Sequence, residues 1–165
     1  MRNDISRGTI EDIDALHRIY MHPTVNPYLN FEIMNKEDFL PIFQELIDSG
    51  KLYIYENTDG AVLATCFVSR QPRRISHIAY ISTLATNPNY QRQGIGTKFM
   101  HELINEIRKD KDVKRIELYA EADNEIALNF YKKLGFQIEG CLKKYFKRPY
   151  ENHFVDELVL AMIFE

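Results

Sequence analysis

The stretch NYQRQGIGTKFM, residues 89–100, is the most informative part of this sequence. Two glycines one residue apart lead into apolar residues at Ile95, Phe99 and Leu103, which is the spacing of one helix face. The first turn of a helix has N–H groups without an internal partner, and the helix dipole places partial positive charge there. Glycines let a ligand approach those donors, so the stretch predicts an anion site, most simply for a pyrophosphate. A plain strand-to-helix turn is the alternative.

Two familiar phosphate motifs fail at this turn. A dinucleotide fingerprint needs a third glycine where Phe99 stands, and a P-loop needs lysine directly after a glycine, whereas Thr97 follows Gly96 here. The turn therefore predicts neither a dinucleotide-binding nor an ATP-binding fold.

The rest of the chain predicts a mixed α/β domain in the order β-α-α-β-β-β-α-β-α-β-β. Helix caps are expected at Thr9 with Asp12 and at Asn35 with Asp38, and Gly135 is expected to end the last helix. Antiparallel strands come first and strand-helix alternation follows. The expected strands are 5–7, 51–56, 61–69, 77–86, 115–120, 136–142 and 155–164, and the expected helices end near residues 20, 48, 110 and 134.

Composition limits the class of protein. A chain of 165 residues with 45% apolar content fits one domain, residues 1–165, and the net charge of −3 gives no global attraction to nucleic acid. No signal-peptide core or membrane-spanning run is present in the sequence, which predicts a cytoplasmic protein without a membrane partner. The five histidines lack zinc-site spacing, so no metal is expected. Cys66 and Cys141 are both expected to be buried free thiols.

A second segment, ADNEIALNFYKKLGF, follows about thirty residues later. Asn124 stands at the expected helix start, and Ala127 and Tyr131 lie near the same helix face. The asparagine can bond amides of a ligand chain, the alanine leaves room for it, and the tyrosine can give a proton to a leaving thiolate. The structural alternatives are a helix cap, a good helix former and a core aromatic residue.

Together the two segments resemble the paired signature of the GNAT superfamily of N-acetyltransferases. YQRQGIG matches the family's Q/R-x-x-G-x-G/A loop, and ADNEIALNFYKKLGF matches N-x-x-A-x-x-Φ-Y-x-K-x-G-F, where Φ is apolar. The strong match covers about residues 77–142. It implies a central mixed, mostly antiparallel sheet of about six to seven strands with about four helices. A splayed parallel strand pair, residues 81–86 and 117–122, would form the acetyl-CoA cleft.

The resemblance also implies the roles of single residues, with acetyl-CoA as cosubstrate. Pyrophosphate would be bound by the backbone of Gln91, Arg92, Gln93, Gly94, Ile95, Gly96 and Thr97. Pantetheine would pair with the backbone of Thr83, Leu84 and Ala85 and contact Asn124 beside Ala127. Tyr131 would be the general acid for the CoA sulfur, and a backbone N–H near Leu84 would polarise the thioester oxygen. A neutral amine would then attack the thioester directly.

The general base departs from the family pattern. Many members carry a carboxylate on the central strand, but HIAYISTLAT has none, and Tyr80 stands where some relatives carry an acid. Glu117 and Glu121 on the next strand share one parity and are the candidates. Their alternative is a solvated or salt-bridged strand face, and a base acting through water, or an amine that arrives neutral, would also serve.

The acceptor is predicted from the end of the chain and from RQPRRISHIAY. Both resemble the branch of ribosomal-protein N-terminal and bacterial amino-acid N-acetyltransferases, which implies a small-molecule amine or amino acid, with a protein N-terminus as the alternative. A non-catalytic acyl-CoA-binding domain is the competing class, and a homodimer is left open. Basic residues at 73, 74, 143, 144, 147 and 148 are expected to be solvated. The aromatic residues that could line an acceptor pocket are Tyr20, Tyr28, Phe31, Tyr145 and Tyr150.

Overall fold

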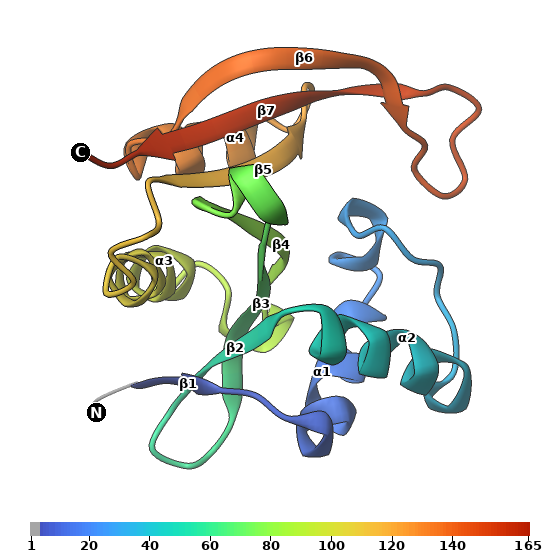
Figure 1. Cartoon of the computed structure of the whole chain (residues 1–165). Coiled ribbons are helices and arrows are strands. Elements are labelled where there is room, and N and C mark those ends of the chain that lie inside the picture. Colours follow the sequence, from blue (N-terminus) through green and yellow to red (C-terminus); the bar gives the residue numbers. More distant parts are fainter. Residues whose placement is uncertain (1–3) are drawn as a thin grey trace. The chain divides into compact units, whose positions relative to one another are not determined.

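The computed structural model describes residues 4–165 and has the element order expected from the sequence (Figure 1). The strands are β1 (Asp4–Arg7), β2 (Lys51–Glu56), β3 (Val62–Arg70), β4 (Ile78–Thr86), β5 (Arg115–Glu121), β6 (Gln137–Phe146) and β7 (Val155–Ile163). The helices are α1 (Ile13–Tyr20), α2 (Lys36–Ser49), α3 (Ile95–Ile107) and α4 (Glu125–Lys133). The predicted mixed α/β fold class is confirmed.

The strands form one seven-stranded sheet in the order β1-β2-β3-β4-β5-β7-β6. Pairing is mostly antiparallel, and β4 and β5 are the parallel pair, with Ile78–Tyr80 opposite Arg115–Glu117. The predicted parallel pair is thus confirmed, whereas its splaying into a cleft stays a prediction. Strand β6 extends beyond the expected residue 142, because the β6–β7 hairpin continues through a register shift between Leu142 and Phe146.

The chain divides into two compact units. The first unit comprises the residues up to Ser69 together with Ser82–Asn105, and the second comprises Arg70–Ile81 together with Glu106–Glu165. The single domain of residues 1–165 stays a prediction.

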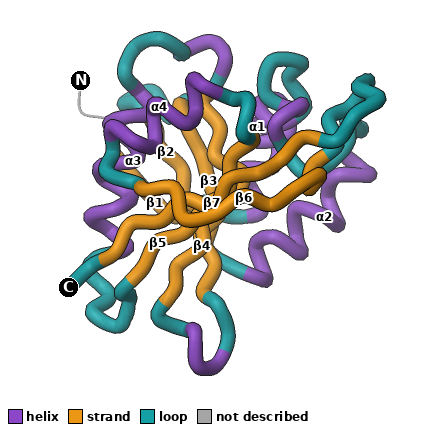
Figure 2. The backbone as a smooth tube through the Cα atoms, turned by 90° about the horizontal axis from the view of Figure 1, so that it is seen from above, coloured by secondary structure: helices purple, strands orange, loops and turns teal. Residues whose placement is uncertain are grey.

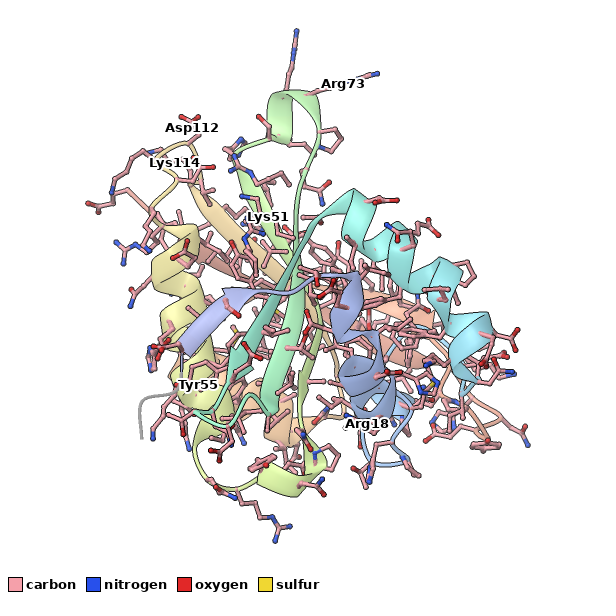
Figure 3. All side chains as sticks on the ribbon, turned by 90° about the horizontal axis from the view of Figure 1, so that it is seen from below. Arg18, Lys51, Tyr55, Arg73, Asp112 and Lys114 are labelled. Atoms are coloured by element: carbon pink, nitrogen blue, oxygen red, sulfur yellow. The ribbon has the colours of Figure 1, made fainter. Side chains whose placement is uncertain are left out.

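In the first unit, α1 and α2 lie on one side of β2 and α3 on the other (Figure 1). Leu52 and Ile54 point towards α1 and α2, where an aromatic and aliphatic core surrounds them. Tyr55 points the opposite way because strand side chains alternate. Tyr55 lies beside α3 (Figure 3), its ring is 5.7 Å from that of Phe99, and its hydroxyl donates to Glu102 at 3.1 Å. The core comprises Leu16, Ile19, Tyr20, Val25, Leu29, Phe39, Phe43, Leu52, Ile54, Val62, Phe67 and Ala85.

The predicted helix caps are present. Thr9 and Asp12 form a capping box around a short 3-10 turn before α1, and the Asn35 side chain accepts from the Asp38 N–H at 2.8 Å. Gly135, after α4, has a φ of 100°, a left-handed conformation that glycine adopts without strain. Local sequence signals therefore set the ends of these helices.

In the second unit, β6 and β7 run side by side (Figure 2), and β7 also pairs with β5. One face of β5 and β7 is apolar and buried, as Ile116, Leu118 and Leu160 show. The opposite face carries the alternate residues, among them Glu117, Tyr119, Glu121 and Glu157. One face of β5 and β7 therefore belongs to the core, and the opposite face carries titratable side chains.

The two cysteines differ. Cys66 on β3 is fully buried, and burial raises the pKa of its thiol. Cys141 on β6 is exposed, so its predicted burial was wrong. Cys141 pairs with Leu158 on the apolar face, but β6 is the last strand of the sheet, so no further strand lies beside it and its side chain stays exposed.

None of the helices within residues 4–165 is long and apolar enough to span a bilayer.

Candidate active site

The glycine turn lies directly before α3. Asn87 begins a 3-10 turn, Pro88–Tyr90, by accepting the Asn89 N–H at 3.1 Å, and α3 starts at Ile95. Lys98 N–H donates to the Gly94 carbonyl at 3.1 Å. This bond makes Gly94 the cap residue, so the amides of the next three residues form the first turn, which has no helical acceptor.

The backbone of this turn suits an anion. Arg92 and Gly94 have φ values of 61° and 72°, and the segment 91–94 is exposed. A Cβ added at Gly94 would have no heavy atom of residues 4–165 within 4 Å apart from its chain neighbours, so this side of the turn is open among the described residues. Alternating backbone conformations of this kind turn successive N–H groups towards one point.

Gly94 and Gly96 differ in backbone conformation. Gly94 needs its positive φ, which side chains with a Cβ rarely adopt. The glycines with positive φ in residues 4–165 are Gly60, Gly94 and Gly135, so Gly96 has an ordinary helical backbone. Alanine would form a better helix at Gly96, and the glycine there needs a different reason.

At the end of β4, Thr83 has a φ of 49°. Positive φ is a genuine outlier for a β-branched residue, and such strain gathers at functional sites. The distortion falls within Thr83–Ala85, the segment that the resemblance assigns to pantetheine. The Ala85 side chain itself is 5% exposed and belongs to the core of the first unit, so only its backbone is available for a ligand.

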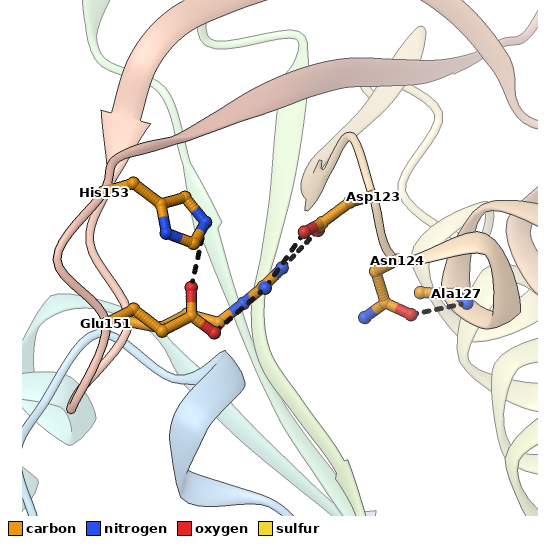
Figure 4. Close-up of polar contacts among 6 residues, drawn as sticks. Asp123, Asn124, Ala127, Glu151 and His153 are labelled. Atoms are coloured by element: carbon orange, nitrogen blue, oxygen red, sulfur yellow. Dashed lines mark hydrogen bonds and ion pairs between the residues drawn. The ribbon is translucent and has the colours of Figure 1, made fainter.

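In the second unit, Asn124 is the cap of α4. Its Oδ1 accepts the Ala127 N–H at 3.1 Å (Figure 4). The structural alternative is thus present, and the Asn124 side chain also interacts with the Glu121 carboxyl, which leaves one N–H of the amide able to donate to a ligand. Ala127 is half-buried beside it.

Tyr131 is 9% exposed on the buried face of α4. Its ring packs on Phe130 and Phe136, with centroids 5.2 and 5.9 Å away. The adjacent aromatic rings fix the side chain, so a phenol held here has one preferred orientation.

The two candidate bases have different surroundings. Arg115 holds Glu117 through two hydrogen bonds, of 3.0 and 2.8 Å, and also contacts Glu139 at 2.6 Å. The salt-bridged alternative therefore describes Glu117. Glu121 is 5% exposed, and burial raises the pKa of its carboxyl despite the opposing effect of Arg148. Of the two candidates, Glu121 has the environment of a proton acceptor.

Sequence reasoning missed a third carboxylate. Glu157 on β7 is the cross-strand partner of Glu121, and burial together with Glu121 raises the pKa of Glu157 to about 7. The available signal was an acidic pair inside the otherwise apolar run VDELVLAMIF, with one of the two on the polar face by parity.

A tyrosine cluster occupies the same face. Tyr80 pairs in register with Glu117, its ring lies 5.3 Å from that of Tyr119, and Tyr119 lies 6.0 Å from Tyr145. Burial raises the pKa of Tyr80 and also that of Tyr119. The position that some relatives give to an acid thus belongs to a group of neutral phenols.

The other aromatic candidates separate into two kinds. Tyr20 is fully buried with its hydroxyl 3.3 Å from Thr65 Oγ1, so it lines no surface hollow. Phe31 packs against the same core but is only partly buried. Tyr28, Tyr145 and Tyr150 are exposed by 52%, 56% and 96%. Tyr20 is therefore closed to an acceptor, and the exposed three are open to one.

The basic residues also separate. Arg73 projects from the turn before β4 into solvent, as expected (Figure 3). Arg148 does not, since its side chain is 13% exposed, pairs with both oxygens of Asp123 and lies 3.5 Å from Glu151. His153 Nε2 is 3.2 Å from Glu151, which extends the network around the start of α4 (Figure 4). The solvated interpretation of Arg148 was therefore wrong, because two nearby carboxylates bind it.

No group of three or more side chains that could hold a metal ion exists within residues 4–165.

Comparisons with known proteins agree with this geometry. The chain matches the sequence model of the Acetyltransferase (GNAT) family over residues 13–136 and belongs to that family. It is 31% identical to L-amino acid N-acetyltransferase AaaT of Escherichia coli over 164 residues, which cover 96% of each chain. It is 32% identical to N-alpha-acetyltransferase 50 of Danio rerio over 151 residues, 89% of this chain and 87% of the relative.

A solved structure shares the fold. Spermidine N-acetyltransferase of Vibrio cholerae, crystallised with CoA and spermine, superposes with a TM-score of 0.84 at 14% identity, over 98% of this chain and 95% of that one. The protein is a GNAT-family N-acetyltransferase, and the two relatives are named for acceptors of different kinds.

Proposed function

We propose that this protein is a cytoplasmic enzyme that transfers the acetyl group of acetyl-CoA to the primary amine of a small molecule, an amino acid or a related amine. The observation that carries the proposal is the exposed turn before α3, where Arg92 and Gly94 have left-handed backbones and the first helical amides have no helical acceptor. The near-complete coverage of the E. coli amino-acid acetyltransferase supports the choice of acceptor.

The residues of the turn would bind the CoA pyrophosphate. The backbone N–H groups of Ile95, Gly96 and Thr97 would donate to it, and the side chains of Gln91, Arg92 and Gln93 would add donors from an exposed loop. The distorted backbone at Thr83 would offer N–H and carbonyl groups to the pantetheine amides, and Asn124 Nδ2 would contact the same arm.

Acetyl-CoA supplies a thioester, whose carbonyl carbon is open to attack by a neutral amine. The C–N bond forms as the C–S bond breaks, and Tyr131 gives its proton to the leaving sulfur. The surplus proton on the acetylated nitrogen passes through water to the tyrosinate, which restores Tyr131. Glu121, rather than the Arg115-bound Glu117, would assist proton removal.

Protein N-terminal acetylation is the second candidate, and the 32% identity to the Danio rerio N-alpha-acetyltransferase favours it. The acceptor group is then an α-amino group on a peptide, and the same cofactor residues serve. A non-catalytic acyl-CoA-binding domain is a third candidate, which would keep cofactor affinity without turnover.

One experiment separates the three. Calorimetry with acetyl-CoA and CoA measures binding, and a thiol-release assay measures turnover on L-amino acids, spermidine and an N-terminal alanyl peptide. The proposal expects micromolar binding and the highest kcat/KM on an amino acid or small amine. Highest activity on the peptide would favour the second candidate, and binding without turnover would favour the third.

A further inference from the structure

Glu157 is a half-buried titratable group that the mechanism above does not use. It lies directly across from Glu121 in the antiparallel register of β5 and β7, so both side chains project from one face of the sheet. Tyr119 shares this face by strand alternation. The pair is therefore part of the polar face of the second unit.

Two carboxylates in this position cannot both be ionised without cost. Like charges directly opposite in a sheet repel, and burial disfavours each charge further. Glu121 is 5% exposed and Glu157 is half-buried. Burial raises the pKa of both, and Glu121 contributes to raising that of Glu157 to about 7. Below about pH 7 the pair therefore holds one proton, above it both carboxylates are ionised, and the apparent pKa belongs to the pair.

The surroundings leave Glu157 without a fixed cation. In the described chain, residues 4–165, no Lys, Arg or His forms an ion pair with Glu157. Arg148 acts on Glu121, and Arg115 is engaged by Glu117 and Glu139. The groups that face Glu157 are Tyr80 from β4, Tyr119 and Glu121 from β5, and Leu142 from β6, with Glu117 and Tyr145 further along the same face.

We propose that Glu157, once the pair has lost its shared proton, takes the proton of the protonated acceptor amine and so delivers the neutral nucleophile. The ammonium N–H bond breaks, an O–H bond forms on Glu157, and water later removes that proton. The tyrosine faces beside the pair attract the ammonium before it is deprotonated. This role rests on the acetyl transfer proposed above, and it adds the residue that makes the amine reactive.

The test compares Glu157→Gln and Glu121→Gln with wild type in a profile of kcat/KM against pH on an amine that wild type acetylates. Wild type should show an ascending limb near pH 7. Glu157→Gln should lower kcat/KM about 100-fold at pH 7 and lose that limb, and the deficit should shrink as rising pH neutralises the free amine. The affinity for CoA, measured by calorimetry, should stay within about 3-fold.

The matched control is Glu139→Gln, which changes an exposed glutamate on β6 of the same unit. It should keep both the rate and the limb. A Glu157→Gln protein with the wild-type limb and rate would overturn the role of Glu157 while leaving the proposed function intact. Absence of turnover by wild type on every acceptor would instead overturn the proposed function, and with it this role.

A second measurement does not depend on activity. Titration of carbon-13-labelled glutamate carboxyls by NMR should show one group with a midpoint near 7 in wild type, absent in Glu157→Gln. In Glu121→Gln that midpoint should move down towards the ordinary glutamate value, because the repelling neighbour is gone. A wild-type protein in which every glutamate titrates below about 5 would overturn the shared proton.

Discussion

The two units of this protein differ in where their polar side chains lie. In the first unit, the phenol of Tyr20 and the hydroxyl of Thr65 lie in the core next to each other, and the groups offered to a ligand are backbone amides of the turn before α3. In the second unit, the sheet face carries Glu121, Glu157 and a cluster of tyrosines. Under the proposed function, the first unit would bind the cofactor through its backbone, and the second unit would transfer protons through its side chains.

This division has a physical reason. A backbone amide offers a donor whose strength does not change with pH, which suits a permanently charged pyrophosphate. Proton transfer needs groups whose pKa lies near the working pH, and burial with a like-charged neighbour is what moves a carboxyl there. Substitutions in the two units should therefore change different quantities: the CoA affinity for the first unit and the turnover for the second.

The largest effect is expected for Tyr131→Phe in the second unit. Removing one hydroxyl while keeping the ring between Phe130 and Phe136 should lower kcat about 100-fold or more and leave CoA affinity within about 3-fold. Steady-state kinetics and calorimetry measure the two quantities. Tyr53→Phe, a buried tyrosine of the first unit, is the control and should change neither. Equal turnover in Tyr131→Phe and wild type would exclude Tyr131 as the acid.

A smaller effect on a different quantity is expected for Gly96→Val in the first unit. Valine is a better helix former than glycine, but its branched side chain would block approach to the first-turn amides. Loss of one or two charge-assisted hydrogen bonds should weaken CoA binding about 10- to 100-fold. Calorimetry gives the affinity, and the melting temperature checks the fold.

Gly96→Ala is its matched control, because the family pattern accepts alanine at this position. Substituting Gly94 would be less informative, since its φ of 72° strains any other residue whether or not a ligand binds. An unchanged CoA affinity in Gly96→Val would contradict the pyrophosphate site.

Glu157→Gln should also change stability. A carboxyl whose folded pKa is about 7 costs stability when it is ionised, and the cost develops as pH rises from about 4.5 to about 7. The variant should therefore be more stable than wild type by about 2 kcal/mol at pH 8, with the gap closing as pH falls towards 4.5. Urea denaturation at several pH values measures this. A constant gap across that range would mean that Glu157 does not titrate there.

The smallest effect is expected for Arg148→Met, which leaves Asp123 and Glu151 without their cation. Arg148 lowers the pKa of Asp123, so this ion pair stabilises the folded state above about pH 4 and less at lower pH. The variant should lose about 1 kcal/mol at neutral pH, and its deficit should narrow as pH falls below 4. Thermal unfolding at pH 7 and pH 3 gives both values.

Much of the fold follows from local patterns. The caps at Thr9 and Asn35 depend on groups two or three residues apart, and glycine at 135 marks the end of α4, so these features can be read in a window of the sequence. The turn before α3 and the segment around Asn124 can also be predicted from the sequence, because each consists of residues close together in the chain. Of the two roles considered for Asn124, the structure shows the helix cap, in which the side-chain oxygen accepts the Ala127 N–H.

The candidate base and the environment of the cysteine on β6 depend on strand pairing instead. Glu121 and Glu157 are distant in the chain, and only the register of β5 with β7 brings them opposite each other. Cys141 is exposed because β6 is the last strand of the sheet order. Arg148 is held because the β6–β7 connection meets the start of α4.

The sequence determined the family, the order of the elements and the glycine turn, because each depends on residue types at short spacings. The tertiary structure decided that Glu117 is bound by Arg115 and that Glu121 faces a second carboxylate. Parity along one strand tells which face a side chain takes, but the charge that it meets there comes from another strand. The protonation of that face is therefore a property of the assembled sheet.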